Sequence, residues 1–167
     1  MHLWVMMAVV VVLTTVESAI GARIQVPELH LNLVPIIVAA WGSLRGFEEG
    51  MLLGTVGGIM LDVVSGAPFG LHTAVLVLLG AVSSTVDGQV VRANVGFIIS
   101  MGLLVTLGYH AALMLGMQAL GWQAFPPERF FRVLFPAALS NTLLLPFVLA
   151  ISEHLYRYLT GWRQMEV

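Results

Sequence analysis

Long apolar stretches follow one another along almost the whole chain, beginning with the first residues, MHLWVMMAVVVVLTTV. A helix needs about 20 mostly apolar residues to cross the hydrocarbon core of a bilayer. Hydrophobic residues make up 59% of this chain and charged residues 10%, against about 45–50% and about 25% in soluble domains. A soluble fold of 167 residues cannot bury that much apolar surface. The sequence therefore predicts a membrane-embedded protein without a substantial soluble domain.

The apolar stretches form one transmembrane domain, residues 1–167, with six candidate spans. Irregular backbone cannot face lipid, and a strand barrel would show short alternating segments, so the spans are predicted to be helices in an all-α, polytopic bundle. They are expected at residues 3–22, 29–44, 47–65, 68–86, 95–120 and 132–152. Pro35 in the second candidate and three acidic residues in the third leave an alternative open, with five spans and one re-entrant segment.

The basic residues give a weak indication of topology. The first of them is Arg23, so the N-terminal stretch lacks the basic region of a cleaved signal peptide and is interpreted as an anchor. There is no Lys, and with six spans the seven Arg residues divide four to three. The four on the side of both termini are Arg45, Arg92, Arg157 and Arg163. Because cytoplasmic loops are enriched in basic residues, both termini are predicted to be cytoplasmic. A short interfacial tail is predicted at 153–167, after the sixth candidate span.

Small residues recur at intervals of four in the third candidate span. Gly50, Gly54 and Gly58 step along one helical face, and Asp62 continues the same stripe. This pattern lets a neighbouring helix approach closely, so the stripe is interpreted as a packing surface, with a ligand crevice lined by backbone as the alternative. A carboxylate at membrane depth is costly, so Asp62 is expected to face the bundle. Its possible roles are structural hydrogen bonding, partner contact, and proton or ion coupling.

The link after this span has the residues of a tight turn. Gly66, which follows Ser65, suits the C-cap of a helix, and Pro68 suits the first turn of the next one. The link is short, so the spans at 47–65 and 68–86 are predicted to form an antiparallel hairpin.

Five further polar residues lie in apolar spans without a catalytic or ligand pattern. His72 and His110 have no second ligand at i+3 or i+4, and no HExxH, Ser-His-Asp or paired-carboxylate motif is present. With Tyr109 they are interpreted as bundle or cavity residues. Asn141 is predicted to form an interhelical hydrogen bond. Glu17 is predicted to snorkel to the interface or to pair with an Arg or His inside the bundle.

Composition also excludes several kinds of site. The chain has no Cys, which rules out disulfides, thiolate catalysis and Cys-based metal sites. No cofactor or metal site is predicted. The absence of a basic cluster argues against nucleic-acid binding, so the expected surroundings are the lipid bilayer and other membrane chains.

A series of motifs runs from Pro27 to Leu71. Pro-Glu-Leu at 27–29 precedes an apolar helix, an Arg-Gly…Glu-Gly turn follows at 45–50, and a Gly-rich helix ends in Leu-Asp-x-x-Ser-Gly-x-Pro-x-Gly-Leu at 61–71. This order resembles the MreD family of bacterial rod shape-determining membrane proteins. The residues that match its most specific part are Gly54, Gly58, Asp62, Ser65, Gly66, Pro68, Gly70 and Leu71.

The resemblance implies a non-enzymatic scaffold in the bacterial cytoplasmic (inner) membrane. Such proteins bind MreC and are linked through it to RodA, a penicillin-binding transpeptidase and MreB, in support of rod shape and peptidoglycan synthesis. The family is also similar in fold to the membrane subunits of energy-coupling-factor transporters.

Two other functions stay open on the sequence. One is a small-molecule-binding subunit of a vitamin-type uptake transporter, with a cavity lined by His72, Tyr109, His110 and Asn141. The other is an intramembrane enzyme that uses Asp62 with one of the two histidines.

Overall fold

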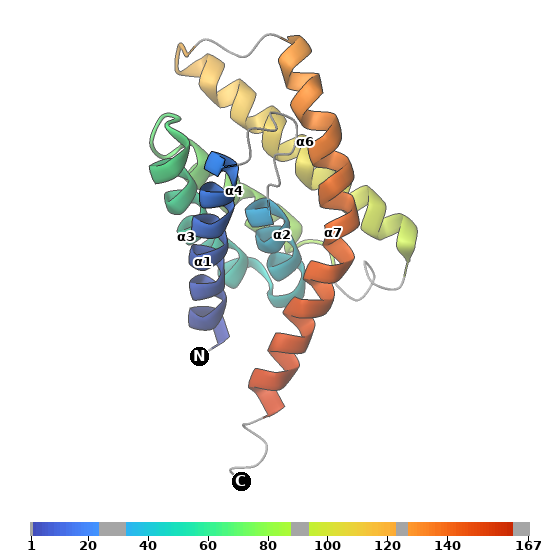
Figure 1. Ribbon diagram of the computed structural model, residues 1–167. Helices are drawn as coiled ribbons and strands as arrows, with labels where there is room; N and C mark the ends of the chain where they lie inside the picture. The colour runs from blue at the N-terminus through green and yellow to red at the C-terminus, as the bar shows by residue number, and fades with distance from the viewer. Residues whose placement is uncertain (1, 24–32, 88–93, 123–126, 162–167) are drawn as a thin grey trace.

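The computed structural model describes residues 2–23, 33–87, 94–122 and 127–161, and within these ranges it is helical with no strand (Figure 1). The predicted all-α class is therefore confirmed. The helices are α1 (His2–Arg23), α2 (Leu33–Arg45), α3 (Phe47–Ser65), α4 (Leu71–Ser83), α6 (Val95–Ala119) and α7 (Pro127–Gly161). Two of these helices, α6 and α7, contain stretches long and apolar enough to cross a membrane, Gly96–Ala119 and Leu134–His154.

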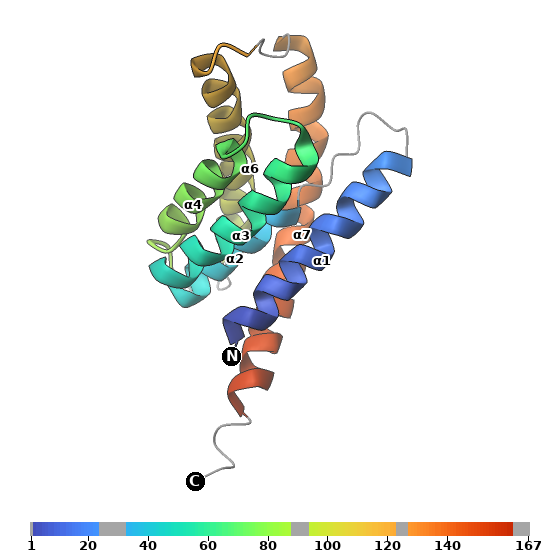
Figure 2. The same ribbon diagram turned by 90° about the vertical axis from the view of Figure 1, so that its left-hand side faces the viewer.

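α3 and α4 form the predicted antiparallel hairpin (Figure 2). α4 is shorter than the expected 68–86, and Pro68 lies in the turn before the helix. The reason is the turn geometry: Gly66 has φ 68° and Gly70 has φ 95°, and glycine adopts these left-handed conformations without the steric cost that other residues pay. Gly66 is the C-cap of α3, as predicted, and Gly70 is the N-cap of α4.

α7 is longer than the expected span at 132–152. It begins at Pro127, before the expected start at residue 132, because proline is well suited to a first helical position. It continues to Gly161, so much of the predicted interfacial tail prolongs this helix. The Pro-Glu-Leu motif at 27–29 lies outside the described residues.

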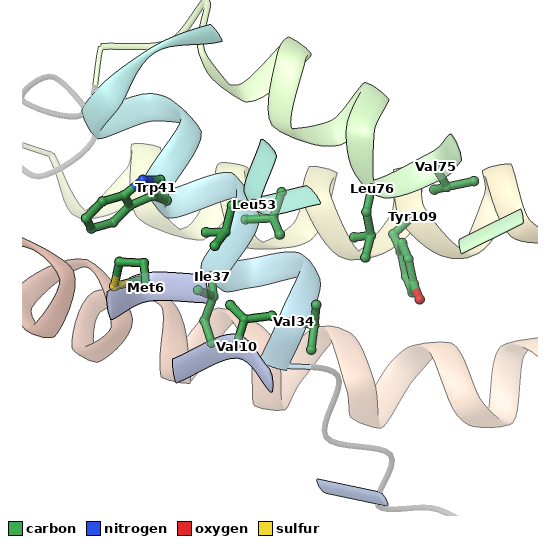
Figure 3. Close-up of a cluster of buried hydrophobic side chains, with 10 residues drawn as sticks. Met6, Val10, Val34, Ile37, Trp41, Leu53, Val75, Leu76 and Tyr109 are labelled. Carbon is green, nitrogen blue, oxygen red and sulfur yellow. The ribbon is translucent and has the colours of Figure 1, made fainter. Parts of the chain in front are cut away.

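α2 lies at the centre of the bundle. It contacts each of the other five helices that the structure describes, and every residue from Val34 to Gly42 is buried. A helix that is apolar on all sides is stable only when protein or lipid surrounds it completely. Figure 3 shows one side of this core, where Ile37 and Trp41 pack with Met6 and Val10 of α1.

The outer faces of α6 and α7 carry large exposed apolar side chains. On α7 they recur every four residues, at Phe135, Leu139, Leu143, Phe147 and Ile151. Both views also show the upper ends of these two helices rising beyond the α3–α4 turn, which is therefore set back from that end of the bundle (Figures 1 and 2).

Candidate functional site

The glycine stripe of α3 lies directly against the backbone of α4. A Cβ atom on Gly54 would overlap the carbonyl oxygen of Leu76, and one on Gly58 would overlap Cα of Thr73. These two glycines therefore let the helix backbones touch, and a larger residue would force the helices apart. The structure uses the stripe for close helix contact.

Three helices meet at glycines near the other end of the hairpin. A Cβ on Gly50 of α3 would lie 2.8 Å from the carbonyl oxygen of Gly80 in α4 and 2.9 Å from Cα of Gly42 in α2. Gly42 and Gly80 were not predicted from the sequence, because each is the single glycine of its helix and forms no stripe. Their partners are distant in the sequence, so no local pattern marks them.

Asp62 caps the N-terminus of α4 from the neighbouring helix. Its Oδ1 accepts the backbone N–H of His72 at 2.9 Å. Its Oδ2 accepts the N–H groups of Gly70 at 2.9 Å and Thr73 at 3.1 Å, and the Thr73 hydroxyl at 2.6 Å. Helix N-termini leave N–H groups unpaired and attract negative charge. The N-cap residue Gly70 has no side chain to satisfy them, so Asp62, which is 4% exposed, takes that role.

His72 links the capped end of α4 to α6. Its Nδ1 and the hydroxyl of Tyr109 share a hydrogen bond of 2.8 Å, and both residues are buried. Tyr109 also meets the ring of His110 edge-on, with ring centroids 5.3 Å apart. The structure thus brings together Asp62, His72, Tyr109 and His110, four of the residues that the sequence analysis singled out.

A second polar contact joins α6 to α7. The Nδ2 group of Asn141 donates to Thr106 Oγ1 at 3.1 Å, and both side chains are 1% exposed. Thr106 Oγ1 in turn donates to the Gly102 carbonyl at 2.8 Å, and His110 Nδ1 donates to the Thr106 carbonyl at 2.8 Å. Asn141 therefore makes an interhelical hydrogen bond. Its partner Thr106 was missed, because nothing in the sequence distinguishes it from other threonines in apolar helices.

Glu17 turns into the bundle and caps the start of α2. Its Oε1 accepts the backbone N–H of Leu33 at 3.2 Å. Its Oε2 is buried and has no hydrogen-bond partner among the described residues. The sequence analysis proposed snorkelling or pairing with a basic side chain. The partner that the structure describes is a backbone N–H group, and no pattern of residue types in the sequence predicts such a partner.

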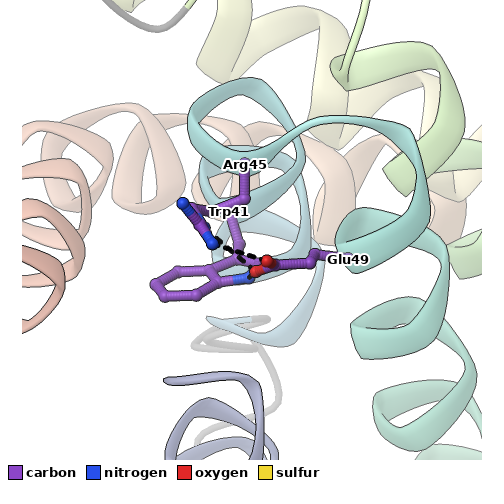
Figure 4. A network of polar contacts seen from close by, with 3 residues as sticks. All are labelled: Trp41, Arg45 and Glu49. Carbon is purple, nitrogen blue, oxygen red and sulfur yellow. Dashed lines mark hydrogen bonds and ion pairs between the residues drawn. The ribbon is translucent and has the colours of Figure 1, made fainter. Parts of the chain in front are cut away.

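The short α2–α3 turn is held by three side chains (Figure 4). Glu49 accepts hydrogen bonds from both Nε and Nη2 of Arg45, at 3.0 and 2.6 Å, and from Nε1 of Trp41 at 3.1 Å. Two-pronged contacts of this kind have a defined geometry. They fix the end of α2 to the first turn of α3, next to the three-glycine contact.

These contacts define a class: a helical bundle with apolar outer faces, in which buried polar side chains bond to neighbouring helices and hold them together. Within the described ranges, no group of three or more His, Asp or Glu side chains could hold a metal ion.

A family model described as rod shape-determining protein MreD matches residues 1–159 of the 167. The chain therefore belongs to the MreD family, as the motif at 61–71 indicated. The family gives it a role in rod-shape determination, as a structural membrane protein outside the known enzyme families. Comparisons with curated proteins and with solved structures gave no match.

Proposed function

We propose that this chain is a scaffold subunit of the bacterial cell-elongation machinery, which binds an MreC-type partner and supports rod shape and peptidoglycan synthesis. The family match over nearly the whole chain carries the proposal. Through MreC the subunit is linked to RodA, a penicillin-binding transpeptidase and MreB. These partners belong to the shape-determining system of the family.

The use of the buried polar residues supports a scaffold over a ligand-binding subunit or an enzyme. Asp62 is bonded to the start of α4, His72 to Tyr109, and Asn141 to Thr106. Each contact joins two helices. Side chains engaged in this way stabilise an arrangement of helices, which is what a scaffold presents to its partners.

The proposed setting is the cytoplasmic membrane, with a single six-pass bundle similar to the membrane subunits of energy-coupling-factor transporters. α6 and α7 meet the length and hydropathy requirements directly. α2 and α4 have 13 residues each, which makes them about 20 Å long and shorter than the hydrocarbon core of about 30 Å. Protein covers the apolar surface of α2 and much of that of α4, so these helices contact other helices more than lipid. The four-to-three Arg distribution favours both termini in the cytoplasm.

Within this bundle, the α3–α4 hairpin is the proposed assembly element. It carries the motif residues of the family, and its helices are in backbone contact at Gly54 and Gly58. Such contact fixes the relative position of the two helices more closely than side-chain packing does. A partner can then recognise a surface of constant shape.

Co-purification tests the proposal. The tagged chain is co-expressed with an MreC-type protein and isolated in mild detergent, beside the variants Gly58→Ala and Gly108→Ala. A Cβ on Gly108 would meet nothing within 4 Å, so this variant is the matched control. We expect the wild-type chain and Gly108→Ala to retain the partner, and Gly58→Ala to lose most of it.

Size-exclusion chromatography and circular dichroism show whether each variant is still folded. Failure of the folded wild-type chain to retain the partner contradicts the scaffold role. Full retention by a folded Gly58→Ala variant contradicts the assignment of assembly to the hairpin.

A further inference from the structure

We propose that the α3–α4 turn, residues 63–70, ends inside the bilayer and contacts lipid acyl chains. α3 and α4 would then form a hairpin that opens toward only one face of the membrane. The inference rests on the membrane setting proposed above but changes the number of passes, because α3 and α4 would enter the bilayer without crossing it and four of the six described helices would cross completely. It is independent of any protein partner.

The turn exposes apolar side chains and no charge. Val63 is 66% exposed, Val64 52% and Phe69 74%. Between Glu49 and Asp87, the only Asp, Glu, Lys or Arg is Asp62, and it is buried. Interfacial loops in contact with water normally carry polar or charged residues, whereas this turn has the surface chemistry of a lipid-facing helix.

The opposite end of the same hairpin is different. Glu48 is exposed at the start of α3, Arg45 and Glu49 form an ion pair beside it, and Asp87 is exposed shortly after α4. This end has the chemistry expected at a membrane surface. The contrast between the two ends gives the hairpin a direction, with the charged end in the interface and the apolar turn pointing into the bilayer.

Several backbone donors of the turn and of the start of α4 are satisfied from within the protein. An unpaired N–H is costly in hydrocarbon, whereas in water the solvent would bind it. Pro68 has no N–H, and Ser65 Oγ accepts from Ala67 at 3.3 Å. Pro68 and Gly70 supply carbonyl acceptors, and Asp62 supplies both carboxylate oxygens. Internal acceptors thus bind the N–H groups of Ala67, Gly70, Leu71, His72, Thr73 and Ala74.

The hydrogen bonds that Asp62 accepts explain why this carboxylate is buried. A carboxylate at membrane depth is expensive, and a turn in water would not require one, since water binds free N–H groups. In hydrocarbon a single acceptor that binds three N–H groups and a hydroxyl replaces the missing solvent.

The dimensions agree with a turn below the surface. α4 has 13 residues, about 20 Å, whereas the hydrocarbon core is about 30 Å thick. The apolar part of α3, residues 50–65, is about 24 Å long by the same rise per residue. The ends of α6 and α7 also extend past the turn in both views (Figures 1 and 2). In α7 this end carries Glu128, Arg129 and Arg132 before the apolar stretch begins at Leu134, so the short length of α4 is the observation that favours a turn below the surface.

Spin labelling measures the depth directly. The chain has no cysteine, so single-cysteine variants need no altered background. Phe69→Cys and Val63→Cys probe the turn. Leu104→Cys, at a 69% exposed site near the middle of α6, is the lipid-facing control, and Glu48→Cys is the control for the charged end of the same hairpin. Each labelled full-length protein is reconstituted alone into phosphatidylethanolamine–phosphatidylglycerol vesicles.

Collision rates with oxygen, which partitions into lipid, and with a water-soluble nickel chelate separate the outcomes. We expect the labels at 69 and 63 to match the label at 104, with oxygen collisions dominant and at least threefold fewer nickel collisions than at 48. Nickel collisions equal to those at 48 would place the turn in water and overturn the inference.

An immobile label protected from both agents would show that protein covers the turn, as in contact with a second copy, and would also overturn the inference. No MreC-type partner is present in these vesicles. A failure to bind MreC therefore leaves this result unchanged, and a turn found in water leaves the scaffold proposal unchanged.

Discussion

The α3–α4 hairpin and the α6–α7 pair hold their helices together in different ways. In the hairpin, glycines bring the two backbones into contact and Asp62 binds four donors of α4. In the α6–α7 pair, Gly102 of α6 lies against Thr142, and one hydrogen bond joins Asn141 to Thr106. Asn141 Oδ1 has no hydrogen-bond partner among the residues that the structure describes. The hairpin is fixed by several glycine contacts and a four-bond cap, and the pair by one glycine contact and one interhelical hydrogen bond.

The two helix pairs show that high hydropathy and close helix contact do not mark the same helices. α6 and α7 are long, and their outer faces are apolar, so they satisfy the requirements for a membrane span. α3 carries three acidic residues and α4 is short, although they form the closest helix contact described. Hydropathy identifies the surface that lipid covers, whereas small-residue spacing identifies the surface that another helix covers.

The largest expected effect comes from removing the cap. Asp62→Ala leaves three N–H groups and a hydroxyl without their acceptor, and each lost partner costs about 1–3 kcal/mol. We expect the free energy of unfolding in bicelles, measured by SDS titration, to fall by on the order of 3 kcal/mol or more. Asp62→Asn keeps one acceptor oxygen and should lose less. If Asp62→Ala unfolds at the same SDS concentration as the wild-type chain, the Asp62 cap does not contribute to the stability of the hairpin.

A smaller effect is expected from the glycine contact. Gly58→Ala places a methyl group against the Thr73 backbone, and overpacking of this kind costs about 1–3 kcal/mol. Gly108→Ala, at an exposed site in α6 with no neighbour within 4 Å, should be neutral or stabilising by up to about 1 kcal/mol, because alanine favours helix. The same titration compares them. Equal stability of the two variants would remove the distinction between the hairpin and the pair.

The smallest effect is expected at the α6–α7 contact. Asn141→Leu removes one interhelical hydrogen bond and also the unpaired Oδ1. Hydrogen bonds between membrane helices contribute on average about 0.6 kcal/mol, so the unfolding free energy should change by less than about 1 kcal/mol. Thr106→Val tests the same bond from the other helix. A loss as large as that of Asp62→Ala would show that a single polar bond fixes α6 to α7 as firmly as the cap fixes α4 to α3.

Patterns within a few helical turns made part of this architecture predictable. Hydropathy predicted the helical class, and the four-residue spacing of Gly50, Gly54 and Gly58 predicted a surface that faces another helix. Asp62 was expected to face the bundle because it lies on that stripe. Gly66 was recognised as a C-cap because glycine is common at that position.

The contacts that sequence reasoning missed join residues far apart in the chain. Tyr109 is 37 positions from His72, and Asn141 is 35 from Thr106. Glu17 binds a backbone N–H, which any residue type could supply. The start of α4 was misplaced because the positive φ of Gly70 is a property of the folded turn, and Pro68 alone fits either location.

The burial of α2 has a consequence for how the protein is made. Ile36 and Ala40 of α2 pack in one cluster with Leu145 and Leu149 of α7, and α7 leaves the ribosome after the other helices that the structure describes. Until it arrives, this side of α2 is in contact with lipid or with the insertion machinery. Assembly around α2 therefore waits for α7, and a nascent chain that stops before Pro127 would leave Ile36 and Ala40 of α2 without their partners in α7.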